Sequence, residues 1–215
     1  MLVFFLFYQR NKGVWAKVLL VYVALCFTND SVLLPLDNVV HQKLIYTILS
    51  GFTITEYSLF AFFLYSIIAN KTFKLIILIA TIGFYLFALY YFFTSSGRSF
   101  DSLAASVESI LIITFCILYL FDQLNKPQMM FIYQDPNFWF VVGFMVYLSG
   151  NLFLFIQANS LHSDIRANFW KIALFSNVVK NILFAIAFST KKAKPIQGEF
   201  GDLFNNDIFE NPSKS

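Results

Sequence analysis

Six long apolar runs constrain the fold of this chain more than any other feature of its sequence. Each run is close to the roughly 20 residues that a helix needs to cross the hydrocarbon core of a bilayer. Within that core every backbone N–H and C=O must be bonded inside the segment, and the runs lack the alternation of barrel strands. The sequence therefore predicts an all-α, polytopic transmembrane helical bundle. Its expected spans are 14–34, 43–69, 73–93, 101–121, 138–157 and 168–189.

The composition excludes several classes of protein. Hydrophobic residues make up 59% of the chain and charged residues 13%, with a mean hydropathy of +0.69. Soluble domains carry about 25% charged residues. A soluble domain of this size also leaves too much surface in water to hide so many apolar side chains. A soluble domain, a disordered chain and a nucleic-acid-binding module are therefore excluded, and the lipid bilayer is the expected partner.

The two ends of the chain differ from the six runs. Met1–Tyr8 is apolar but short, and as a helix it would rise only about 12 Å. We therefore expect six full spans plus an N-terminal half-span, in a protein of a seven-helix type. Either the true start lies upstream, or the half-span packs at one membrane face. The expected domains are a transmembrane helical bundle over 1–190 and a polar tail over 191–215.

Basic residues in the loops predict the orientation of the bundle, because cytoplasmic loops carry an excess of Lys and Arg. Nine basic residues fall on one side of the predicted membrane and four on the other. The C-terminus lies on the richer side, so we expect a cytoplasmic tail. The richer side holds Arg10, Lys12, Lys17, Lys71, Lys74, Lys126, Lys191, Lys192 and Lys194, and the poorer side holds Lys43, Arg98, Arg166 and Lys171.

Three charged residues stand out deep inside the apolar runs, where a charge is costly and marks a functional site by default. Glu56 lies thirteen residues beyond Lys43. Lys180 lies thirteen residues beyond Ala167, so its predicted depth is nearly the same. Glu108 is expected about a turn and a half nearer the outside. Because pairing lowers the cost of burying a charge, we expect Lys180 to face one of the carboxylates.

Polar and small residues accompany these charges at helical spacing. Asn177 and Asn181 flank Lys180 at positions that predict one shared helix face. The fifth run carries a stripe of small and polar residues, namely Gly143, Tyr147, Gly150 and Asn151. Small residues let two helices approach closely, and polar residues form hydrogen bonds between them. We expect these groups to converge on one intramembrane polar cavity. The predicted polar cluster comprises Glu56, Glu108, Lys180, Asn151, Asn177, Asn181 and Tyr147.

Two interpretations of this cluster stay open. The pair of Glu56 and Lys180 either fixes the register of two helices or belongs to a functional site. Cys26 and Cys116 lie in apolar runs, where thiols behave as small hydrophobes, and no Cys/His spacing indicates a metal. We therefore expect no metal and no cofactor, and no residue is assigned a catalytic role.

Three stretches of the chain resemble a family of multi-span membrane proteins from Bacteroidota, often encoded near sensor histidine kinases. They are YTILSGFTITEYSLFAFFLY at 46–65, DPNFWFVVGFMVYLSGNLFLFI at 135–156 and NVVKNILFAIAF at 177–188. The resemblance implies a seven-helix protein of the bacterial inner membrane and points to signalling, but it implies no reaction. The chain departs from the family at its N-terminus, where most of the first helix is absent.

These observations leave three functional hypotheses. The leading one is a non-enzymatic sensory or accessory subunit that binds a ligand or lipid in the polar cavity and signals to a partner protein. The second is an intramembrane lipid hydrolase, because Glu56–Leu59 and Asn151–Leu154 are faintly similar to the Asp-x-x-Leu patterns of lysoplasmalogenase-type enzymes. The third is a proton-coupled transporter that uses Glu56 or Glu108.

Overall fold

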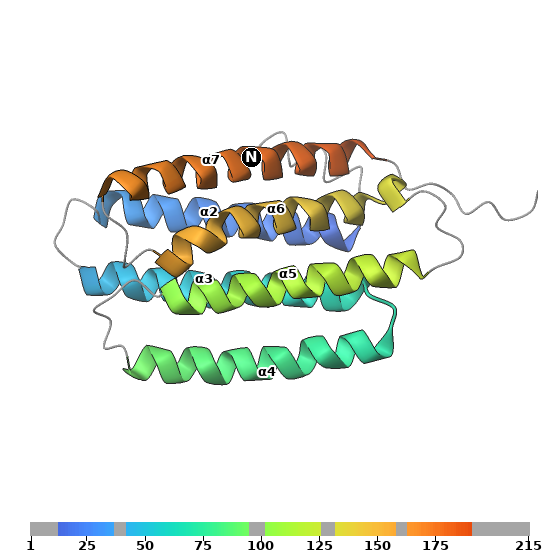
Figure 1. The fold of residues 1–215 in the computed structure, drawn as a ribbon, viewed down its shortest axis with the longest axis horizontal. Coiled ribbons are helices and arrows are strands. Elements are labelled where there is room, and N and C mark those ends of the chain that lie inside the picture. The colour runs from blue at the N-terminus through green and yellow to red at the C-terminus, as the bar shows by residue number, and fades with distance from the viewer. Residues whose placement is uncertain (1–12, 37–41, 95–101, 126–131, 158–162, 191–215) are drawn as a thin grey trace, which may run out of the picture.

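The computed structural model describes residues 13–36, 42–94, 102–125, 132–157 and 163–190. These residues form six α-helices and one short 3-10 helix, and they contain no strand (Figure 1). The elements are α2 (Val14–Leu36), α3 (Gln42–Ile67), α4 (Lys71–Thr94), α5 (Ser102–Leu124), η1 (Ile132–Gln134), α6 (Pro136–Gln157) and α7 (Ser163–Ser189). The all-α class is thus confirmed, and each α-helix overlaps one predicted span.

The ends of the helices refine the predicted boundaries. α7 begins five residues earlier than the predicted span at 168. α6 begins at Pro136, where the fixed φ angle and missing N–H of proline suit the first helical position. Asp135 caps this helix, because its Oδ1 accepts a hydrogen bond from the Asn137 N–H at 3.0 Å. Asn70 caps α4 in the same way, because its Oδ1 accepts a hydrogen bond from the Thr72 N–H at 2.8 Å.

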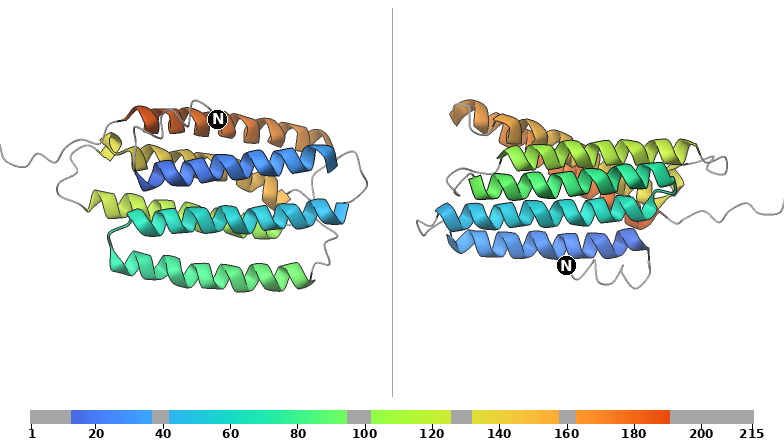
Figure 2. Two further views of the ribbon diagram at one scale, coloured as in Figure 1. Left: turned by 180° about the vertical axis from the view of Figure 1, so that it is seen from behind. Right: turned by 90° about the horizontal axis from the view of Figure 1, so that it is seen from below.

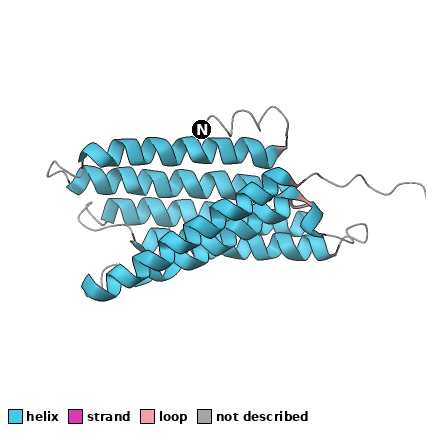
Figure 3. Cartoon of the chain, turned by 90° about the horizontal axis from the view of Figure 1, so that it is seen from above, coloured by secondary structure: helices cyan, strands magenta, loops and turns pink. Residues whose placement is uncertain are grey.

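The helices run up and down through an elongated bundle. α3 lies centrally and packs against α2, α4 and α5, while α6 packs against α5 on one side and most extensively against α7 on the other. In the view of Figure 1, α4 and α7 lie at opposite edges of the bundle, and Figure 2 shows the same bundle from behind and from below. Seen from above, the pair of α6 and α7 crosses the remaining helices obliquely (Figure 3).

Two glycines explain how closely α6 approaches α7. A Cβ atom added at Gly143 would lie 2.8 Å from the Phe184 Cε1 atom, and one added at Gly150 would overlap the Ser176 side chain. Real Cβ atoms do not make contacts this short, so both positions need glycine for the present packing. The small-residue stripe predicted from the sequence therefore serves helix approach, as in other membrane bundles.

Four of the described helical segments are long and apolar enough to cross a membrane. They are Thr47–Ile67, Lys71–Thr94, Leu103–Leu124 and Lys171–Ser189. Large apolar side chains also cover the outside of the bundle, such as Phe93 at 78% exposed and Phe175 at 69%. This surface suits lipid and would be unfavourable in water. The count of six spans stays a prediction, and the N-terminal half-span and the tail over 191–215 lie outside the described residues.

Candidate functional site

The three charged residues singled out in the sequence are all buried in the interior of the bundle. Glu56 on α3 is 8% exposed, Glu108 on α5 is 4% exposed and Lys180 on α7 is 5% exposed. Each comes from a different helix, although α3 and α7 do not pack extensively against each other. A side chain from another helix must therefore link Lys180 to the carboxylates.

Tyr22 on α2 contacts Lys180 and lies beside Glu56. Lys180 Nζ donates a hydrogen bond to the Tyr22 hydroxyl oxygen at 3.2 Å. The Glu56 carboxylate lies within electrostatic range of Lys180 and next to the same hydroxyl. A hydroxyl accepts and donates at once, so Tyr22 is placed to bridge the two charges. The sequence predicted that Lys180 faces a carboxylate, and Lys180 acts electrostatically on Glu56.

Aromatic rings surround the Lys180 ammonium group. Its Nζ atom lies 3.9 Å from the centroid of the Tyr147 ring on α6 and 5.1 Å from that of the Tyr22 ring. A cation over the face of an aromatic ring is attracted by the ring quadrupole, and more strongly when water is excluded. The two tyrosines therefore stabilise a buried ammonium group that has left its hydration shell. Together, Tyr22, Glu56, Glu108, Tyr147 and Lys180 form what we call the polar cluster.

Glu108 adds a second carboxylate to the cluster. It interacts electrostatically with Glu56, whereas Lys180 acts on Glu56. The cluster thus holds two acidic groups and one basic group. Glu56 Oε1 and Glu108 Oε1 are both buried and have no hydrogen-bond partner among the described residues. Buried acceptors in native proteins are almost always satisfied, so these two atoms mark places where a hydrogen-bond donor from outside the chain would fit.

The three asparagines predicted to join the cluster behave differently from one another. Asn177 on α7 is half-buried, and its Oδ1 atom is a further buried acceptor without a partner. Asn151 is buried on α6, where its Nδ2 donates to the Tyr147 carbonyl at 2.7 Å, so it supports the backbone of its own helix. Asn181 is exposed and does not face the interior. Placing Asn181 on the Lys180 face was wrong, because successive residues on a helix point about 100° apart.

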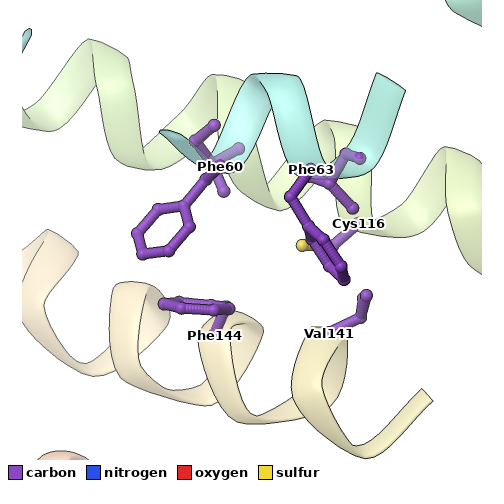
Figure 4. Close-up of a pocket in the computed structure, with 7 residues that line it drawn as sticks. Phe60, Phe63, Cys116, Val141 and Phe144 are labelled. Atoms are coloured by element: carbon purple, nitrogen blue, oxygen red, sulfur yellow. The ribbon is translucent and has the colours of Figure 1, made fainter. Parts of the chain in front are cut away.

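An aromatic core underlies the polar cluster. The Tyr22 ring packs against Phe60 at a centroid distance of 5.1 Å and against Phe144 at 5.6 Å, and Phe60 and Phe144 lie 3.7 Å apart. Next to them is a narrow apolar crevice (Figure 4). It is too narrow for a water molecule, and is lined by Phe60, Phe63, Leu64, Ile112, Cys116, Val141 and Phe144. The polar cluster therefore borders an apolar region of low dielectric constant that excludes water.

A separate polar group lies at the end of the bundle where α3 connects to α4. The buried Asp122 carboxylate on α5 accepts hydrogen bonds from the Ala69 and Asn70 backbone N–H groups, each at 3.0 Å. These two donors precede α4, so Asp122 holds the start of that helix against α5. Nearby on α5, the buried Tyr119 hydroxyl and Gln123 Oε1 have no hydrogen-bond partner. In the described part of the chain, no set of three or more His, Cys, Asp or Glu residues could hold a metal ion.

No family model, curated protein or solved structure matches this chain. The likeness to the Bacteroidota family therefore stays an expectation from the sequence. The site must be interpreted from its own chemistry. That chemistry consists of two carboxylates, one ammonium group and two phenols that are gathered from five helices in an apolar surrounding.

Proposed function

We propose that the protein is a multi-pass inner-membrane protein that acts as a sensory or accessory subunit, with its C-terminus in the cytoplasm. In this proposal the polar cluster binds a small polar ligand or a lipid headgroup. Binding changes how the five helices pack, and this change is transmitted to a partner protein. The orientation rests on the distribution of basic residues given above, and the signalling role rests on the family resemblance.

The observation that carries this proposal is that five different helices contribute to one cluster. A purely structural ion pair that sets helix register needs a side chain from each of two helices. Here α2, α3, α5, α6 and α7 each supply one side chain. Glu108 adds a carboxylate beside Glu56 without bringing a cation, which costs stability instead of adding to it. Proteins retain such costly intramembrane groups for function.

The chemistry of the cluster indicates the class of ligand. Its unpartnered atoms are acceptors, namely Glu56 Oε1, Glu108 Oε1 and, one turn from Lys180, Asn177 Oδ1. A ligand that satisfies them must bring hydrogen-bond donors, such as hydroxyl, amide or amine groups. An anionic group would meet the Lys180 ammonium group. A zwitterionic or polyhydroxylated molecule therefore fits better than a purely apolar one.

Native mass spectrometry of the protein purified gently from its own membranes tests this proposal. We expect wild-type protein to carry a defined extra mass, either a small molecule or a lipid. Glu108→Gln should lose that mass, whereas Thr114→Val should keep it, because Thr114 is exposed on the same helix. Retention of the same bound molecule by Glu108→Gln, or wild-type protein that carries neither ligand nor partner, would contradict the proposal.

Proton-coupled transport is the second candidate, because two electrostatically coupled carboxylates, one of which also interacts with an ammonium group, suit the uptake of a proton. In vesicles that contain a pH-sensitive dye, it predicts solute-dependent proton movement by the wild type and none by Glu108→Gln. Solute uptake that ignores an imposed proton gradient would remove this candidate.

A further inference from the structure

The outer face of α7 carries a polar side chain at the middle of a membrane-spanning segment. Asn181 lies near the centre of the span Lys171–Ser189 and is exposed. Its neighbours on this face are apolar and exposed, such as Val178 at 55% and Ile182 at 55%. No hydrogen bond joins the Asn181 side chain to any other described residue. Within hydrocarbon, an unsatisfied carboxamide costs several kcal/mol, so this position requires a partner beyond the described residues.

The exposed residues around Asn181 form a regular seam. Leu174, Val178, Asn181 and Ala185 are all exposed and follow one another at intervals of four, three and four residues. This is the spacing by which two helices pack along a shared seam. Ala185 is small, and small residues let membrane helices approach closely. α7 is an edge of the bundle and its other side is occupied by α6, so the seam faces outwards (Figure 1).

We infer that this seam, comprising Leu174, Val178, Asn181 and Ala185, binds the same seam on a second copy of the chain. A carboxamide carries both donors and an acceptor, so two copies of Asn181 satisfy each other. All copies have the same orientation in a membrane, and a two-fold axis along the bilayer normal therefore places each Asn181 opposite its own copy at equal depth. A different partner would need a hydrogen-bonding side chain at that depth, whereas a second copy supplies one automatically.

This inference does not depend on the ligand proposed for the polar cluster. It requires only that α7 lies in a membrane. Lys180, the neighbouring residue, faces the interior of its own bundle, so dimerisation leaves the cluster enclosed within each copy.

The test is the association of full-length protein, labelled with donor or acceptor dye, in liposomes at decreasing protein-to-lipid ratios. We expect the wild type to dimerise and Asn181→Val to dissociate about three- to twenty-fold more readily, the range that interhelical polar contacts give in membranes. Asn181→Gln keeps the carboxamide and should retain most of the association. The matched control is Ile182→Val on the adjacent exposed position, which should behave as the wild type.

Disulfide cross-linking of Val178→Cys in native membranes provides a second measurement that does not depend on the Asn181 variants. We expect a covalent dimer from Val178→Cys, and none from Ile82→Cys, which is exposed on α4 at the opposite edge, or from the chain with only Cys26 and Cys116. A wild type that is monomeric at every dilution would overturn the inference. So would unchanged association of Asn181→Val, or a Val178→Cys cross-link to a different protein.

Discussion

Replacing Lys180 by Met tests whether the charges of the cluster depend on one another through Tyr22. Methionine has a similar length and no charge, so the change removes the hydrogen bond to the Tyr22 hydroxyl and the contact with the Tyr147 ring. Glu56 then remains buried without its cation. Breaking a buried pair by removing one partner costs about 3–5 kcal/mol, and we expect a loss of unfolding free energy in that range.

A second substitution separates the cost of the lost pair from the cost of the lost side chain. Glu56→Gln removes the charge that Lys180→Met leaves behind, so the double variant should recover much of the loss. We expect a coupling free energy of about 0.5–3 kcal/mol between the two positions, the range found for residues in one network. Additive losses would mean that Glu56 and Lys180 act independently.

Repeating this cycle in a Tyr22→Phe background isolates the bridge. Phenylalanine keeps the ring that packs on Phe60 and removes the hydroxyl. The coupling between Glu56 and Lys180 should fall by more than half. The control background is Tyr85→Phe, which removes the hydroxyl bonded to Ser58 at 2.8 Å on the far side of α3 and should leave the coupling unchanged. Unfolding in mixed micelles of increasing SDS content, followed by circular dichroism, measures each free energy. A coupling that survives Tyr22→Phe would refute the bridge.

Three further predictions concern the bundle around the cluster, and the same unfolding assay checks them. Gly150→Ala should lower the free energy of unfolding by about 1–3 kcal/mol through overpacking. Adding Ser176→Gly should restore much of that stability, because the new Cβ atom clashes with the Ser176 side chain. The control Gly83→Ala has open space around it and should be neutral or stabilising. Asp122→Ala should cost about 1–3 kcal/mol, since it leaves two backbone N–H groups without their acceptor. Phe144→Ala should cost about 3–5 kcal/mol by enlarging the crevice, and equal stability to the wild type would show that the aromatic core is loosely packed.

Hydrophobicity made the helices predictable from the sequence. Runs of about 20 apolar residues leave the backbone no alternative to a helix in a membrane, so every described α-helix overlaps an expected span. The boundaries were less predictable, because the extra turn at the start of α7 is polar and contains Asp164 and Arg166. Hydropathy detects the part of a helix that lies in lipid and not its extension beyond the lipid.

The charged members of the cluster were predictable for the opposite reason. Glu56, Glu108 and Lys180 stand out because charges are rare in apolar runs. Tyr22 was missed, since tyrosine is common in this chain, with 11 copies, and its hydroxyl gives no signal in a hydropathy pattern. Only the arrangement of the helices shows that its hydroxyl bonds Lys180 and lies beside Glu56. Asn181 was wrongly predicted to face the interior. Helical spacing shows which residues share a face, but it does not show where the buried part of that face ends.

The most direct test of the central claim, that the polar cluster is a functional site, uses Glu108. This residue has no cation partner of its own in the structure, so a purely structural cluster predicts that Glu108→Gln is neutral or stabilising. We would delete the gene in its native host and compare the transcript profiles restored by the wild type and by Glu108→Gln at equal membrane levels. The account predicts a variant that folds and accumulates normally but does not restore the profile. Full restoration by Glu108→Gln would contradict it.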